Sequence, residues 1–252
     1  PSGLFCDSFS ADNQVIKAAR TFSFQTPKKA FFFPEHAPFS GEWTYESIGL
    51  HPDFEQLTQT DFHYLTIRDA TLLWKPRTKF SHKGSFGHAL IIAGSKGKIG
   101  AAVLATRACL RGGAGLVTVH TPACGNFVLQ TAVPEAMNSI DKETDFWTEL
   151  PDLQGISSIG IGPGIGRAVE TAAVLKQLIL ESRIPLVLDA DALNLISENP
   201  ELMDQIPENS ILTPHPKEFE RLFGKTADSF QRNDLQRKMS LDRRIYIILK
   251  GA

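Results

Sequence analysis

The residues best suited to chemistry in this chain lie where short apolar runs end. In "ILTPHPKEFERLFG" (211–224), His215 stands between Pro214 and Pro216. The two prolines hold Thr213 and His215 in extended geometry, and Pro216 suits the first position of a helix with Glu218 in its first turn. An imidazole held this rigidly can position a ligand. The alternative is a rigid turn that happens to contain a histidine.

Two glycine-rich turns offer backbone N–H groups to an anion. "AGSKGKIGAA" (93–102) and "GIGPGIG" (160–166) each follow an apolar run and lead into a helical pattern. A helix start of this kind attracts phosphates. The first turn is not a Walker loop, because Ile99 follows Lys98, and the second does not meet the dinucleotide pattern G-x-G-x-x-G. Tight helix–sheet packing is the alternative reading of both turns.

Charged residues follow two further apolar runs. Asp189 and Asp191 in "LDAD" (188–191) point to the same side if the strand continues. Such a pair suits binding of a cation, a donor or a substrate, with Asp191 as a helix N-cap the alternative for one of them. Lys250 ends "IYIILK" and precedes Gly251, an arrangement suited to a phosphate, or simply to a solvated lysine.

The elements that must position these residues alternate between strands and helices. Residues 76–252 predict an α/β domain with a mostly parallel central sheet, whose ligands bind at the carboxyl ends of its strands. Residues 51–75 predict a linker ending in a short helix. Residues 1–50 predict a small β-rich region of short strands and turns around "TFSF", "AFFF" and "GEWTYESIGL". The predicted strands of the α/β domain are 87–94, 115–121, 156–162, 185–191 and 243–250. Its predicted helices are 99–113, 167–183 and 216–224.

Composition limits the class of protein. The 252 residues are 42% hydrophobic and 21% charged, with a net charge of −2. These values indicate a globular protein with a sizeable core and disfavour electrostatic nucleic-acid binding. No membrane-length apolar run or signal peptide is visible. Cys6, Cys109 and Cys124 lack metal-ligand spacing and suit reduced thiols in the cytoplasm, with Cys109 in a helix core. The ends "PSGL" and "IYIILKGA" suggest a fragment.

Taken in order, several motifs resemble one family. "HKGSFGHALIIAGSKGKIGAAVLATRACLRGGAGLVTVHTP", "IGIGPGIG", "PLVLDADALNLI", "LTPHPKEFERL" and "LKGA" follow one another as in the ADP/ATP-dependent NAD(P)H-hydrate dehydratases, which have a ribokinase-like three-layer fold. Residues 1–50, with "PSGLFCD" and "TFSFQTPKKAFFF", resemble the last part of an NAD(P)H-hydrate epimerase domain. The two domains are fused in the bifunctional repair enzyme.

The resemblance implies a hydro-lyase that uses ADP or ATP, with Mg²⁺, to restore NADH or NADPH from its hydrate. By the same resemblance Ala101, Gly166 and His215 contact the hydrated cofactor, and Lys250, Gly251 and Ala252 begin the nucleotide-phosphate loop. Asp189, Asp191 and Glu218 would lie near the site.

Further expectations follow from the same resemblance. Ser2 matches a position that contributes to K⁺ binding in the epimerase domain. The catalytic base is expected beyond Ala252, so we expect this chain alone not to turn over the hydrate. The family also implies a homo-oligomer. Two other functions stay open: a sugar or vitamin kinase of the same fold, and a nucleotide-binding module without catalysis.

Overall fold

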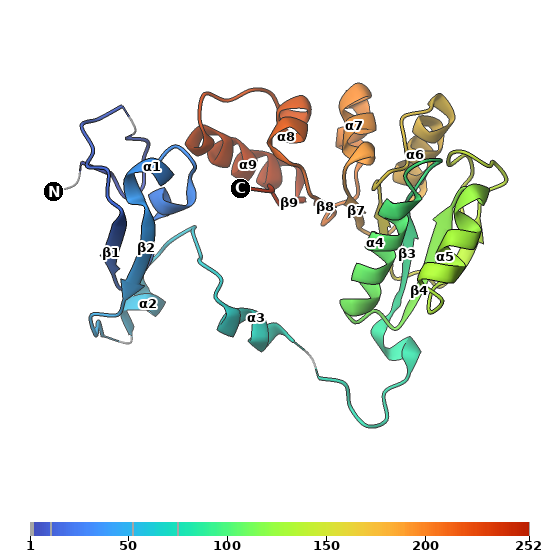
Figure 1. Cartoon of the computed structure of the whole chain (residues 1–252), viewed down its shortest axis with the longest axis horizontal. Coiled ribbons are helices and arrows are strands. Elements are labelled where there is room, and N and C mark those ends of the chain that lie inside the picture. The colour runs from blue at the N-terminus through green and yellow to red at the C-terminus, as the bar shows by residue number, and fades with distance from the viewer. Residues whose placement is uncertain (1–2, 11, 52, 75, 252) are drawn as a thin grey trace. The chain divides into compact units, whose positions relative to one another are not determined.

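The computed structural model describes residues 3–10, 12–51, 53–74 and 76–251, which form two compact units. The first unit runs to residue 79 and includes residues 226–234. The second unit takes residues 80–225 and 235–251. Figure 1 labels most of the helices and strands along the chain. Ser2 and Ala252, two of the predicted site residues, lie outside the described residues.

A seven-stranded sheet forms the centre of the second unit. Its strand order is β5-β4-β3-β6-β7-β8-β9, and all six pairings are parallel. This arrangement confirms the predicted parallel α/β sheet. The strands are β3 (His88–Ile92), β4 (Leu116–Thr121), β5 (Met137–Ile140), β6 (Ser158–Ile161), β7 (Leu186–Leu188), β8 (Ile211–Leu212) and β9 (Tyr246–Ile247).

Register places one apolar row across five of these strands. Ile92, Ile161, Leu188, Leu212 and Ile247 are paired in succession, and each is at most 8% exposed. Because neighbouring residues of a strand face opposite sides of the sheet, this row defines one buried face. The row belongs to the larger hydrophobic core of the unit.

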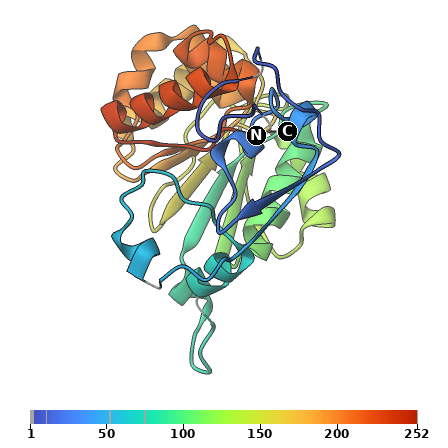
Figure 2. The same ribbon diagram turned by 90° about the vertical axis from the view of Figure 1, so that its left-hand side faces the viewer.

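Helices cover both faces of the sheet. The core containing the row also includes Leu175 of α6, Leu193 of α7 and Phe219 of α8. A second, smaller core joins Ala93 and Val119 to residues of α4 and α5 on the other face. The sheet therefore lies between two helical layers, as Figure 2 shows for the green α4 and α5 and the orange to red α7 to α9. The helices are α4 (Ile99–Arg111), α5 (Asn126–Ala132), α6 (Val169–Glu181), α7 (Asp191–Glu198), α8 (Pro216–Phe223) and α9 (Ser229–Arg243), with the 3₁₀ turns η2 (Lys83–Phe86), η3 (Ala123–Gly125) and η4 (Pro200–Gln205).

Two predicted strands are shorter than their apolar runs. The strand predicted over 185–191 ends at Leu188, because Ala190 adopts a φ of 48° that no strand accommodates. The strand predicted over 243–250 is regular only at Tyr246 and Ile247. Beyond it, Lys250 N still donates to Pro214 O at 2.9 Å, so the chain stays beside the end of β8.

The first unit contains one parallel pair of strands, β1 (Arg20–Phe24) and β2 (Glu42–Glu46). The strand-like interpretation of "AFFF" is wrong: these residues lie in the 3₁₀ turn η1 (Lys29–Phe32) and the residue after it. The turn brings the rings of Phe31 and Phe32 to 5.5 and 5.3 Å from the Trp43 ring, which a straight strand would not do because successive side chains would alternate. The remaining helices of this unit are α1 (Ala37–Ser40), α2 (Asp53–Leu57) and α3 (Ile67–Leu73).

Candidate functional site

The site is built where five neighbouring strands end. Since β3, β6, β7, β8 and β9 are consecutive in the parallel sheet, the segments that follow them meet at one edge. These segments are residues 93–98, 162–166, 189–191, 213–215 and 248–251. All the predicted site residues of the described second unit lie in them or in the first turn of the helix that follows.

The two glycine turns are bonded to one another. Gly94 N donates to Pro163 O at 2.9 Å, and Ser95 Oγ donates to Gly164 O at 2.7 Å. Gly162 has a φ of 129°, and a Cβ there would lie 1.8 Å from the carbonyl oxygen of Asp189. Glycine is therefore required at this position by both conformation and space. The turns form one continuous backbone surface.

Asp189 and Asp191 contact different neighbours. Asp189 Oδ1 accepts a hydrogen bond from Thr213 Oγ1 at 2.8 Å and pairs with Lys250 Nζ at 2.5 Å. Asp191 Oδ2 accepts from Gly166 N at 2.9 Å and pairs with Lys98 Nζ at 3.2 Å. The expectation that both point one way on a continued strand is wrong, because the strand ends before them.

Asp191 does not cap α7. The N-cap position belongs to Ala190, which has no capping side chain, and Asp191 is the first helical residue. Its carboxylate points instead to the two glycine turns, as its bonds show. The helix-capping alternative for this residue is therefore wrong.

His215 is the N-cap of α8. Its Nδ1 accepts hydrogen bonds from the N–H groups of Lys217 at 3.1 Å and Glu218 at 3.3 Å. Glu218 reciprocates by accepting from His215 N at 2.9 Å, and Pro216 takes the first helical position as predicted. With Nδ1 used as an acceptor, Nε2 carries the proton and lies 3.2 Å from Glu218 Oε1.

The capping box explains why the ring is held in place, and it also limits what the ring offers. The side chain of His215 is 45% exposed, whereas that of Glu218 is 6% exposed. The exposed part of the ring is therefore what a ligand could reach. A contact between His215 and a substrate stays a prediction.

The other predicted residues occupy the same edge. Ala101 lies in the first turn of α4, where its Cβ would be 3.1 Å from a Cβ built on Gly164. Gly166 has a φ of 81° and donates to Asp191, and Gly251 is exposed after Lys250. Sequence reasoning missed Lys98 as a site residue. The signal available was a lysine inside a glycine turn at a strand end.

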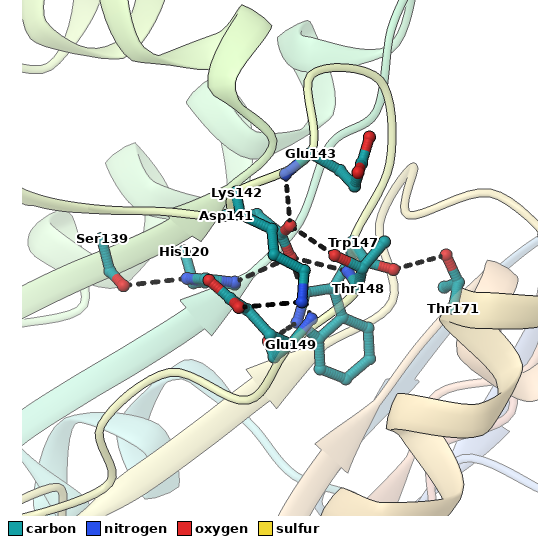
Figure 3. Close-up of polar contacts among 9 residues, drawn as sticks. All are labelled: His120, Ser139, Asp141, Lys142, Glu143, Trp147, Thr148, Glu149 and Thr171. Atoms are coloured by element: carbon teal, nitrogen blue, oxygen red, sulfur yellow. Dashed lines mark hydrogen bonds and ion pairs between the residues drawn. The ribbon is translucent and has the colours of Figure 1, made fainter.

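A second polar cluster, which the sequence analysis did not find, lies at the ends of β4 and β5 (Figure 3). We call it the Asp141 cluster: His120, Ser139, Asp141, Glu143, Trp147, Thr148, Glu149 and Thr171. Asp141 Oδ1 accepts from Glu143 N at 2.9 Å and Thr148 Oγ1 at 2.7 Å, while its Oδ2 accepts from Thr148 N at 2.6 Å and Glu149 N at 3.1 Å. The side chain of Asp141 is fully buried.

Burial and bonding act in opposite directions on the pKa of Asp141. Burial raises it, but the backbone and hydroxyl donors together outweigh burial and hold the pKa below its usual value. His120 Nδ1 lies 2.8 Å from Ser139 Oγ, and its Nε2 lies 3.5 Å from Asp141 Oδ2. Burial lowers the pKa of His120, and the neighbouring carboxylate offsets this only in part.

The Asp141 cluster supports the first glycine turn through the loop that it organises. Asp145, in the middle of residues 141–149, accepts from Lys96 N at 2.8 Å through its carbonyl oxygen. Its carboxylate pairs with Lys96 Nζ at 2.9 Å. The loop held by Asp141 therefore braces turn 94–98 from the side away from β6.

Three observations concern other kinds of site. Among the described residues, no group of three or more His, Cys, Asp or Glu is arranged to hold a metal ion. No helix in the described part of the chain is both long and apolar enough to cross a membrane. The three cysteines are free; Cys109 is half-buried in α4, where burial raises the pKa of its thiol.

Comparison with known proteins adds a family to this geometry. Residues 89–252 match the family model described as NAD(P)H-hydrate dehydratase. A bifunctional NAD(P)H-hydrate repair enzyme of Coxiella burnetii is 36% identical over 259 residues, covering 100% of this chain and 51% of the relative. The corresponding enzyme of Escherichia coli is 33% identical, covering 100% and 48%. The chain spans about half the length of the curated relatives it matches.

Solved structures resemble most of this chain. An ADP/ATP-dependent NAD(P)H-hydrate dehydratase from Bacillus subtilis, co-crystallised with ATP and Mg²⁺, has a TM-score of 0.61 at 28% identity and covers 74% of this chain and 65% of its own. A ribokinase-like protein from Enterococcus faecalis has a TM-score of 0.60 at 26% identity, covering 70% and 61%. The three-layer architecture is the ribokinase-like fold expected from the sequence.

Proposed function

This chain belongs to the NAD(P)H-hydrate dehydratase family, and we propose that the protein carrying it uses ADP or ATP to dehydrate hydrated NADH or NADPH to the reduced cofactor. The observation that carries the proposal is the meeting of five segments at one sheet edge. Two glycine turns, two lysines and a fixed histidine lie together there. That set offers backbone surface for a ring and, in Lys250, an ammonium group for phosphates.

The reaction needs phosphate because hydroxide is a poor leaving group. The ring hydroxyl of the hydrate attacks the terminal phosphorus of ADP or ATP, and AMP or ADP departs. The carbon–oxygen bond then breaks with loss of inorganic phosphate, while a proton leaves the adjacent ring carbon and the double bond is restored. Catalysis of such a transfer depends on positioning and on stabilising charge around the phosphoryl group.

The chain's own residues divide into two halves in this proposal. Ala101, Gly166 and the Nε2 edge of His215 contact the hydrated ring. Lys250 and Gly251, with Ala252 beyond the described residues, contact the nucleotide phosphates. Support comes from the bonds that place turn 162–166 against turn 94–98, and from Lys250 N donating to Pro214 O beside His215.

Mg²⁺ enters the proposal with the nucleotide. The Bacillus subtilis relative was crystallised with ATP and Mg²⁺, and Mg²⁺ is usually bound through carboxylates together with substrate phosphates. Mg²⁺ neutralises charge on the phosphates when it is bound.

Residues 1–50 belong to a second proposed activity. We assign them to the last part of an epimerase domain that uses K⁺ and interconverts the two forms of the hydrate, because the relatives are named as bifunctional repair enzymes. We also propose a cytoplasmic homo-oligomer; the free cysteines support the cytoplasmic location, and the oligomer rests on the resemblance to the family.

The test is an assay of the complete gene product that carries this chain. Hydrated NADH with ADP or ATP should regain the 340 nm absorbance of NADH, with one inorganic phosphate released per NADH formed. A non-hydrolysable nucleotide should give neither signal. A sugar or vitamin kinase would instead consume ATP only with its alcohol acceptor and release no phosphate, and that result would refute the proposal.

A further inference from the structure

We infer that Asp189 and Asp191 are positioning residues with separate tasks, Asp191 holding the surface for the hydrated ring and Asp189 holding the nucleotide lysine. The inference rests on the proposed function and adds to it, since it assigns each half of the reaction to one carboxylate. Its basis is that Asp189 and Asp191, separated only by Ala190, bond to different partners.

Asp191 joins the two glycine turns through a single oxygen. Oδ2 accepts from Gly166 N in turn 162–166 and from Lys98 Nζ in turn 94–98. The N–H of Gly166 is thereby engaged, so the orientation of this peptide is set by Asp191. The other proposed ring contact, Ala101, lies three residues after Lys98. Loss of this bridge would free the Gly166 peptide and the Lys98 side chain, and would leave the two turns joined only by the Gly94–Pro163 and Ser95–Gly164 bonds.

Asp189 makes the equivalent bridge in the nucleotide half. Oδ1 accepts from Thr213 Oγ1 and from Lys250 Nζ. The backbone N of Lys250 donates to Pro214 O at 2.9 Å, so both the main chain and the side chain of this lysine are tied to residues 213–214. The ammonium is held in place before any phosphate arrives, which is the arrangement that electrostatic preorganisation requires.

The ion pairs themselves contribute little to stability, which makes the inference testable. The side chains of Asp191 and Lys98 are 17% and 53% exposed, and those of Asp189 and Lys250 are 29% and 47% exposed. Partly exposed pairs of this kind add little to the free energy of folding. Variants that lose one carboxylate should therefore fold, and their defects should appear in ligand constants.

The experiment compares Asp191→Asn and Asp189→Asn in the complete gene product. Asp204→Asn is the matched control, because Asp204 pairs with Arg243 at 3.2 Å in the turn η4, outside the five segments. Each KM is measured with the other substrate saturating. Losing a hydrogen bond to a charged group should change the affected KM about tenfold.

The two aspartate variants should raise the KM of different substrates. Asp191→Asn should raise KM for hydrated NADH and leave KM for the nucleotide within about twofold. Asp189→Asn should raise KM for the nucleotide and leave that for the hydrate, while the control changes neither. In calorimetric titrations with ADP alone, the dissociation constant for ADP should rise in Asp189→Asn and stay unchanged in Asp191→Asn. Lys98→Met and Thr213→Val remove the partner side of each bridge and should reproduce the two patterns more weakly.

Equal changes in both constants for both variants would overturn the inference, since a structural role has no reason to separate the two ligands. If either aspartate variant fails to fold, the partner-side variant decides in the same way. A wild-type protein that binds ADP but does not dehydrate the hydrate would refute the proposed function and the ring half of the inference together. The ADP titrations would then still test whether Asp189 supports nucleotide binding.

Discussion

Replacing Asp141 by Asn should lower the free energy of unfolding by about 3–5 kcal/mol. The amide could place its NH₂ at Oδ2, where it would face two backbone N–H donors, or at Oδ1, where it would face Glu143 N and the Thr148 hydroxyl. The second orientation is favoured because a hydroxyl can rotate to accept. One backbone donor is then left unsatisfied, which costs about 1–3 kcal/mol. The two bonds kept at Oδ2 become neutral instead of charge-assisted, at about 1 kcal/mol each.

The assay is equilibrium unfolding in urea followed by the fluorescence of Trp147. This ring is 1% exposed and belongs to the Asp141 cluster, so it reports on the local unfolding of that region. Trp43→Phe and Trp74→Phe in the background remove the other two tryptophans. Asp152→Asn is the control, because this exposed carboxylate keeps its one acceptor oxygen for Gln154 N as an amide. A loss below about 1 kcal/mol for Asp141→Asn, with an unchanged m-value, would refute the reasoning.

Three further predictions concern single positions. Gly162→Ala should destabilise the protein by more than about 3 kcal/mol, because its Cβ would overlap Asp189 O. Gly155 also has a positive φ, of 74°, but nothing lies within 4 Å of a Cβ there, so Gly155→Ala should cost about 1 kcal/mol. Equal urea midpoints for the two variants would contradict this. Burial lowers the pKa of His120, so on acidification the unfolded chain takes up a proton before the folded chain does. The free energy of unfolding should therefore be constant above about pH 6.5 and fall as the pH drops toward the folded pKa. The slope should be up to about 1.4 kcal/mol per pH unit. His120→Gln should remove that part of the slope, and an unchanged slope would show that His120 does not titrate. His215→Ala should cost about 1 kcal/mol of stability, and His215→Asn should restore the helix cap. If the imidazole ring contacts the substrate, KM for the hydrate should be raised in both variants. A normal KM in His215→Asn would show that His215 acts only as a cap.

The order of strands and helices was predictable because each long element carries its own pattern. The buried residues of α6, such as Leu175 and Leu178, lie at helical spacing, and "ALII" and "LVL" are apolar runs typical of parallel strands. That strand ends would meet at one edge followed from parallel geometry alone. The sheet edge at which the predicted residues meet could therefore be predicted from the sequence, and its role as a ligand site stays a prediction.

The partners within that edge were not predictable in the same way. The positive φ of Ala190 turns Asp191 away from Asp189, and nothing in an alanine indicates such a turn. The bridge from Asp191 to Lys98 spans 93 residues, so no local spacing reveals it. The Asp141 cluster could not be predicted for a related reason. His120 lies near the end of β4 and Asp141 follows β5, and they become neighbours only because these two strands are adjacent in the sheet.

The separation between Asp189 and Lys250 has a consequence for synthesis of the protein. The lysine is added 61 residues after the aspartate, which at ~5–20 residues per second leaves the carboxylate without it for roughly 3–12 s. Lys98 and Gly166, in contrast, precede Asp191 in the chain and are already made when it emerges from the ribosome. The Asp191 bridge can thus form on the nascent chain as soon as Asp191 emerges, while the Asp189 bridge waits for Lys250, beyond β9, to be translated.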